Sequence, residues 1–163
     1  MSYPDPRYLG ETGEVSAVLR RLDQDPELTV GTSKASYIAT GESTGGRFGL
    51  YRWDMAAGTP GAAAAHFHRT ISESFFILSG KVGLFDGEKW TEATSGDFLY
   101  VPEGGLHGFR NASDQPASML ILFAPGAPRE AYFEGLAEIA LGRRKFTPEE
   151  FKEFCERHDN IFV

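Results

Sequence analysis

The chain has 163 residues, which is enough for one domain with a sizeable core and too few for two. Its formal charge of −7 disfavours a nucleic acid or an anionic membrane as a partner, because few cations are free to neutralise phosphate groups. Cys155 is the one cysteine, so an internal disulfide bond is impossible and a reducing compartment is favoured. The chain shows neither a basic, apolar signal sequence nor an apolar run of membrane-spanning length, so we expect a cytoplasmic protein.

The first 32 residues are expected to form an N-terminal arm. Within this segment, four apolar residues follow the spacing of one helical face, which predicts a short helix in the arm. These residues are Val15, Val18, Leu19 and Leu22. The arm ends where the sequence changes to short β-rich runs.

Residues 33–125 are expected to form a single β-barrel domain. Short runs rich in β-branched and aromatic residues, such as residues 48–55 and 118–123, alternate with glycine-bearing turns. No helical pattern separates these runs, and short strands at close spacing are typical of a sandwich or a barrel. The alanine-rich residues 62–67 are not expected to be helical, because prolines and glycines crowd their N-terminal side and a β-rich run follows.

Residues 126–163 carry two helical patterns. The first has one apolar face and ends at Gly142. That face consists of Tyr132, Phe133, Leu136, Ile139 and Ala140. The second begins at residues 147–150, whose threonine, proline and glutamate form a capping box, and His158 is expected to pack or cap there. We therefore expect an all-β barrel closed by two short C-terminal helices.

Three of the four histidines lie in two expected turn-and-strand segments. His66 and His68 are two residues apart, so in a strand both imidazoles point to the same face and can share a metal ion. Glu73 lies at an odd offset from both and reaches that face only if residues 69–72 form a bend. His107 follows a turn with proline and glycine and opens another expected strand. Three imidazoles and one carboxylate would leave coordination positions for water, oxygen or substrate.

These segments resemble the two sequence motifs of the cupin superfamily. The first motif is matched by Gly61, His66, His68, Glu73 and Gly80. The second is matched in full by Gly96, Pro102, Gly104, His107 and Asn111. Four residues separate Gly61 from His66 where the family has five, a departure that affects the entering turn and not the ligands. The resemblance covers roughly residues 34–123 and implies a double-stranded β-helix, the cupin jelly-roll barrel. It also implies four ligands to one divalent transition metal ion, namely His66, His68, Glu73 and His107.

The barrel interior is expected to be rich in phenylalanine, which suits a flat, apolar or aromatic ligand. The candidate pocket residues are Phe48, Arg52, Phe75, Ile77 and Phe109. Strand alternation places Phe75 and Ile77 on the face of Glu73, but the sequence does not decide which face of residues 48–55 points inward. Arg52 is the candidate for holding a carboxylate or a phosphate. Alternatively, the apolar side chains only fill the interior, as they do in any small barrel.

The resemblance is to quercetinase-like single-domain cupins, which implies a metal-dependent dioxygenase. Its substrate would be a small, flat, enolisable or aromatic compound, flavonol-like or polyketide-like, and Glu73 would be the catalytic residue that accepts the substrate proton. The alternatives are a non-oxidative cyclase or isomerase of a small biosynthetic intermediate, and a non-enzymatic small-molecule-binding cupin. Iron, nickel, manganese, cobalt, copper and zinc all accept this donor set. The expected partners are a small-molecule substrate, O₂ if the reaction is oxidative, and a second copy of the chain contacted through residues 1–32 in a homodimer.

Overall fold

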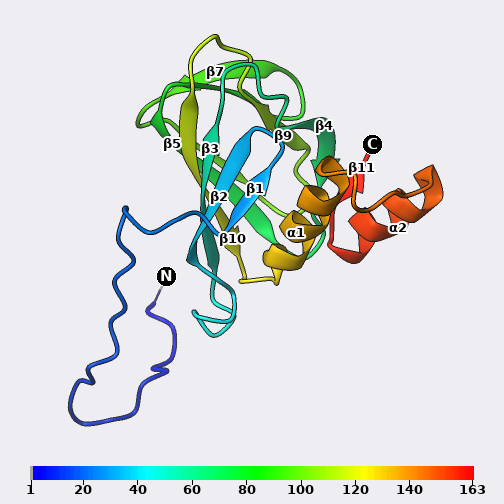
Figure 1. Ribbon diagram of the computed structural model, residues 1–163. Helices are drawn as coiled ribbons and strands as arrows, with labels where there is room; N and C mark the ends of the chain where they lie inside the picture. Colours follow the sequence, from blue (N-terminus) through cyan, green and yellow to red (C-terminus); the bar gives the residue numbers. More distant parts are fainter. Residues whose placement is uncertain (1) are drawn as a thin grey trace.

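The computed structural model describes residues 2–163, which form two antiparallel sheets and two helices (Figure 1). The six-stranded sheet contains, in spatial order, β1 (Leu28–Val30), β2 (Ser33–Ala39), β3 (Gly49–Met55), β10 (Ala117–Ala124), β5 (Ser72–Ser79) and β8 (Phe98–Val101). The five-stranded sheet contains β11 (Ile161–Phe162), β4 (Ala62–Phe67), β9 (His107–Arg110), β6 (Lys81–Phe85) and β7 (Trp90–Thr94). The expected all-β barrel is confirmed, and the alanine-rich segment before His66 is a strand.

Side chains along each strand point alternately to the two faces of its sheet. The core lies where the inner faces of the two sheets pack against each other. In β3, Tyr51, Trp53 and Met55 are buried, while the residues between them are partly exposed. Tyr51 packs edge-on against Phe123 of β10 at a ring-centroid distance of 5.8 Å, and against Phe133 at 5.2 Å. Phe133 belongs to a helix, so the core continues from the sheets into the C-terminal segment.

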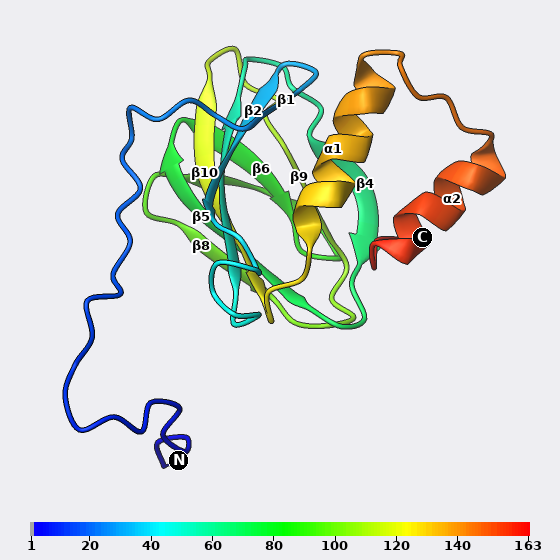
Figure 2. The same ribbon diagram turned by 60° about the horizontal axis from the view of Figure 1, so that its bottom comes forward.

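The two expected C-terminal helices are α1 (Arg129–Ala140) and α2 (Pro148–Arg157). The side chain of Thr147 accepts a hydrogen bond from the backbone N–H of Glu150, whose side chain bonds back to the Thr147 N–H, so the capping box is confirmed. Helix α1 lies between the barrel and α2 (Figure 2). In residues 2–163, neither helix is long and apolar enough to cross a membrane.

The N-terminal segment differs from its prediction in two ways. Residues 2–27 contain no helix and extend away from the barrel (Figures 1 and 2), so the helix expected from Val15 to Leu22 is wrong. The four apolar side chains of that pattern are exposed, with no packing surface offered to them by residues 2–163, and a short helix without such a surface is marginal in water. The sheet also begins earlier than expected, because β1 at Leu28–Val30 lies inside the segment 1–32 assigned to the arm.

Candidate metal centre

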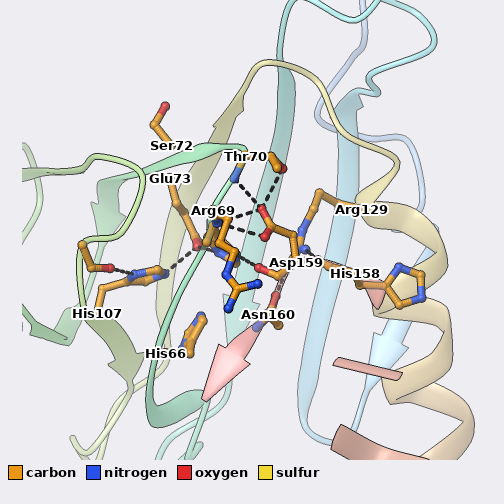
Figure 3. A network of polar contacts seen from close by, with 12 residues as sticks. His66, Arg69, Thr70, Ser72, Glu73, His107, Arg129, His158, Asp159 and Asn160 are labelled. Atoms are coloured by element: carbon orange, nitrogen blue, oxygen red, sulfur yellow. Dashed lines mark hydrogen bonds and ion pairs between the residues drawn. The ribbon is translucent and has the colours of Figure 1, made fainter. Parts of the chain in front are cut away.

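Four side chains converge inside the barrel, and Figure 3 shows three of them, His66, Glu73 and His107. His66 is the second-last residue of β4, His68 directly follows this strand, Glu73 is in β5 and His107 opens β9. One ligand atom of each lies within 4.8 Å of the ligand atoms of the others, and all four side chains are buried. His66 and His107 are direct partners across the antiparallel pair of β4 and β9, which is why residues 41 positions apart meet.

The expected bend between His68 and Glu73 is confirmed and is held by the C-terminal segment. The chain bends at Arg69 and Thr70 before β5 begins. The carboxylate of Asp159 accepts hydrogen bonds from the backbone N–H of Arg69 at 2.9 Å and of Thr70 at 2.8 Å, and from the Thr70 hydroxyl at 2.7 Å. This contact turns Glu73 to the same side as the histidines, although strand alternation alone would point it away.

The three imidazoles share one hydrogen-bond arrangement that suits metal binding. In each histidine, Nδ1 lies within hydrogen-bond distance of a backbone carbonyl oxygen, which directs the opposite ring nitrogen, Nε2, toward the cluster, where it can bind a metal once its proton is lost. The carbonyls belong to Ala64, Asp159 and Gly105, at 3.0, 2.5 and 2.9 Å from His66, His68 and His107 respectively. The orientation of all three rings is therefore determined by the backbone around them.

Glu73 is the charged member of the cluster. Its Oε2 atom lies 2.8 Å from Nε2 of His68 and 2.8 Å from Nε2 of His107. Burial alone would raise the pKa of Glu73, but the hydrogen bonds from His107 and His68 outweigh it and hold the pKa well below its usual range. Burial lowers the pKa of His66 to about 4, against the opposing charge of Glu73. At neutral pH the cluster thus offers a carboxylate and a neutral imidazole.

The residues present fit a divalent transition metal ion. Three imidazole nitrogens and one carboxylate oxygen are donors that such ions prefer, and each ring is already held in the orientation that ligation requires. The donor set accepts several metals and does not select one among them. The chemistry of the cluster therefore supports a metal centre of unspecified identity.

A cavity of about 420 Å³ opens from this cluster toward α1. His66 and Glu73 form part of its wall, so a molecule in the cavity would touch the cluster directly. Most of the remaining wall is apolar or aromatic, and it includes Trp53, Phe109, Phe123 and Phe133, together with the polar residues Arg129 and Asn160. The volume is within the range of small-molecule sites, which is roughly 300–1,000 Å³.

The candidate pocket residues lie in three different places. Phe109 lines the cavity, as expected. Phe75 and Ile77 are fully buried in the core and are not part of the lining. The ring of Phe75 instead packs against the ring of His107, at a centroid distance of 6.0 Å. Phe48 precedes β3, is half-buried and is also absent from the lining.

Arg52 is on the wrong face of β3 for the role expected of it. Its guanidinium forms an ion pair with Asp54 at 2.9 Å on the outer face of the sheet. Trp53, the residue between them, points inward and lines the cavity. Strand alternation separates inner from outer residues correctly, but it does not say which set is inner.

The site contains residues of the C-terminal segment that the sequence did not indicate as functional. Asp159 holds the bend before Glu73, while Arg129 and Asn160 line the cavity. The sequence does contain an indication that Arg129 is buried. It lies three residues before Tyr132 and four before Phe133, and therefore on the apolar face of α1. A charged residue on a buried helical face is uncommon and indicates a special role.

His158 has the packing role expected of it. Its ring lies 5.7 Å from the ring of Tyr132 and 4.9 Å from that of Phe154, between the two helices and outside the four-residue cluster. It is therefore a suitable control for the histidines of the site.

We predict that Asp159→Gly weakens metal binding about 10-fold or more while the chain still folds. Asp159 has φ = 58°, which glycine adopts freely, so the backbone carbonyl that holds His68 can stay in place while the carboxylate that holds the bend is lost. The affinity for Zn²⁺ is measured by competition with a chromophoric chelator. Asp86→Gly is the matched control, since Asp86 accepts similar backbone bonds in an exposed turn; equal affinities of the two variants would contradict the prediction.

Comparison with known proteins agrees with the class that fold and site define, a jelly-roll barrel with a buried three-histidine, one-carboxylate cluster. The family described as a cupin domain matches residues 51–123. An uncharacterized protein of Streptomyces coelicolor is 32% identical over 77 residues, which are 47% of this chain and 68% of that protein. The chain belongs to the cupin superfamily, as its motifs predicted.

Two further likenesses concern an enzyme and a solved structure. Quercetin 2,3-dioxygenase of Bacillus subtilis is 31% identical over 96 residues, which are 58% of this chain but only 28% of that enzyme. The crystal structure of a predicted oxalate decarboxylase from Thermotoga maritima superposes with a TM-score of 0.59 at 18% identity, covering 67% of this chain and 99% of that one. The second likeness concerns the fold alone.

Proposed function

We propose that the protein is a metal-dependent dioxygenase that acts on a small, flat, enolisable or aromatic compound. The observation that carries the proposal is the junction of the buried cluster with the cavity, since His66 and Glu73 belong to both. A substrate that fills a cavity of about 420 Å³ would be in contact with the residues that hold the metal. The likeness to quercetin 2,3-dioxygenase supports an oxidative reaction over a non-oxidative one.

In the proposed reaction, the chain holds the metal, orients the substrate and removes a proton. When bound by the three histidines and Glu73, a transition metal supplies Lewis acidity and redox capacity. Oε2 of Glu73 bonds to His68 and His107, and within residues 2–163 no hydrogen bond to Oε1 is found, so Oε1 is available to accept the acidic proton of the substrate. Trp53 and Phe109 in the wall orient a flat molecule and exclude water from it.

Metal analysis followed by oxygen uptake tests this function. The protein is purified without added metal, its metal content is determined, and oxygen consumption is measured with a panel of flavonols and enolisable diketones. We expect the iron, nickel or manganese form to consume oxygen with at least one of these substrates. Zinc as the sole metal together with no oxygen uptake would contradict the dioxygenase and favour an isomerase, a cyclase or a binding protein.

We also propose that the protein forms a homodimer in which residues 2–27 contact the partner. Val15, Val18 and Leu22 in this segment are exposed among the described residues, and such apolar side chains are typical of interaction surfaces. Light scattering should give twice the chain mass of 17.9 kDa at micromolar concentration, and removal of residues 2–27 should lower it to the monomer mass. A monomeric mass for the full chain would contradict this proposal.

A further inference from the structure

Arg129 is a buried cation in the wall of the cavity. It is the first residue of α1, and only 4% of its surface is exposed. Figure 3 shows its side chain beside Asn160 and Asp159, on the side of the cluster that faces α1. Among the described residues that line the cavity, it is the only lysine or arginine.

The hydrogen bonds of Arg129 leave its charge unpaired. A guanidinium has five N–H donors. One donates to the carbonyl oxygen of His158 at 2.6 Å and another to Oδ1 of Asn160 at 2.7 Å, and both acceptors are neutral. Nε is buried and has no hydrogen-bond partner. No carboxylate of residues 2–163 lies within ion-pair distance of the guanidinium.

Aromatic rings compensate only part of this charge. The guanidinium carbon lies 4.8 Å from the ring centroid of Phe123 and 4.7 Å from that of Tyr132, so the group is in contact with aromatic surface. A buried cation is nevertheless costly unless an anion pairs with it. The edge of the guanidinium, where the N–H groups are, is the part that can bond to a ligand.

The charge balance of the site favours an anion in the cavity. Burial lowers the pKa of Arg129, and the carboxylate of Glu73 offsets this effect in part. When Glu73 binds a divalent metal, its negative charge is committed to that ion. With a divalent metal bound, the two charges of the metal and the one of Arg129 exceed the two negative charges of Glu73 and Asp159 by one.

We propose that Arg129 binds a carboxylate group of the substrate, which is therefore a small planar carboxylic acid with an aromatic or unsaturated body. The proposal rests on the proposed function in that the cavity is taken as the substrate site. The edge of a guanidinium matches the two oxygens of a carboxylate, and the apolar wall formed by Trp53, Phe109 and Phe133 matches a flat body. A phosphate ester is less suited, because the lining formed by the described residues offers a single guanidinium and no lysine.

The test compares an acid with its uncharged isostere in metal-free protein. Trp53 lines the cavity, so its fluorescence reports binding, and a Trp90→Phe background removes the signal of the other tryptophan. We expect benzoate to bind about 10-fold or more tightly than benzamide, as a charge-assisted hydrogen bond requires. Equal affinities, or tighter binding of phenyl phosphate than of benzoate, would overturn the proposal.

Asn160→Asp sharpens the test without removing a core side chain. It places a carboxylate where the Asn160 amide oxygen now lies, 2.7 Å from the guanidinium, so the charge of Arg129 is paired internally. The preference for benzoate over benzamide should then disappear, whereas Arg143→Gln, which changes an exposed arginine beyond α1, should keep it. A preference that survives in Asn160→Asp would overturn the proposal. If that variant does not fold, the comparison of benzoate with benzamide in the wild type still decides.

Failure of this inference and failure of the proposed function are distinguishable. Binding to metal-free protein involves neither the metal nor oxygen. A preference for benzoate without oxygen uptake would support the carboxylate site and contradict the dioxygenase function. Oxygen uptake with uncharged substrates, together with equal binding of benzoate and benzamide, would support the dioxygenase function and contradict the role proposed for Arg129.

Discussion

Glu73→Gln should lower turnover about 100-fold or more while most of the bound metal remains. The amide keeps the shape of the side chain, and its oxygen can still ligate a metal weakly. It cannot accept a proton, and proton transfer by a positioned group contributes roughly 10²–10⁴-fold to a rate. The rate and the metal content are measured on the same preparation, so that the two losses can be compared directly.

Glu92→Gln is the matched control for this variant, because Glu92 is an exposed glutamate of β7 that pairs with Lys81 at 2.9 Å. It should change neither turnover nor metal content. If Glu73→Gln lost metal and activity in parallel, Glu73 would be only a ligand. If it kept full activity, proton transfer by Glu73 would have to be abandoned.

His107→Ala should remove nearly all of the bound metal, from about one ion per chain to less than about 0.1. His107 is fully buried, presents Nε2 to the cluster and directly faces His66 across the strand pair. Its loss removes one of the four donor atoms and leaves an empty space beside the ring of Phe75. Elemental analysis after gel filtration measures the remaining metal.

His158→Ala is the control that distinguishes a ligand from an ordinary histidine. Its ring packs between Tyr132 and Phe154 and takes no part in the cluster, so the variant should keep its metal. Circular dichroism establishes that both variants are folded. Equal metal content in His107→Ala and His158→Ala would show that His107 is not a ligand.

The sequence predicted the cluster well because its residues are tied to local features. His66 and His68 are two residues apart at the end of β4, a spacing that predicts two imidazoles on one side of the chain, and His107 follows a turn whose proline and glycines are visible in the sequence. The helix start at Thr147 was predictable for the same reason, since a capping box depends on residues three positions apart. Local geometry thus accounts for the positions of the three histidines and for the helix start, whereas the four-residue set was implied by the resemblance to cupins.

Features that depend on distant contacts were not predictable. Asp159 bonds to His68 and to the bend that follows it, although 91 positions separate Asp159 from His68. Arg52 was assigned to the pocket because alternation gives two faces but not the one that is buried, which depends on how β3 pairs with β10. The helix expected from Val15 failed because apolar periodicity predicts a helix only where a surface is present to cover its apolar face.

Anomalous diffraction from crystals of the metal-loaded protein is the most direct test of the metal centre. A single strong peak is expected at the point where the side chains of His66, His68, Glu73 and His107 meet, about 2.0–2.2 Å from the three Nε2 atoms and from one carboxylate oxygen. Data collected at the absorption edge of each candidate metal would also identify the ion. A protein loaded with metal whose peak lies elsewhere, or that shows no peak between these four residues, would contradict the metal centre.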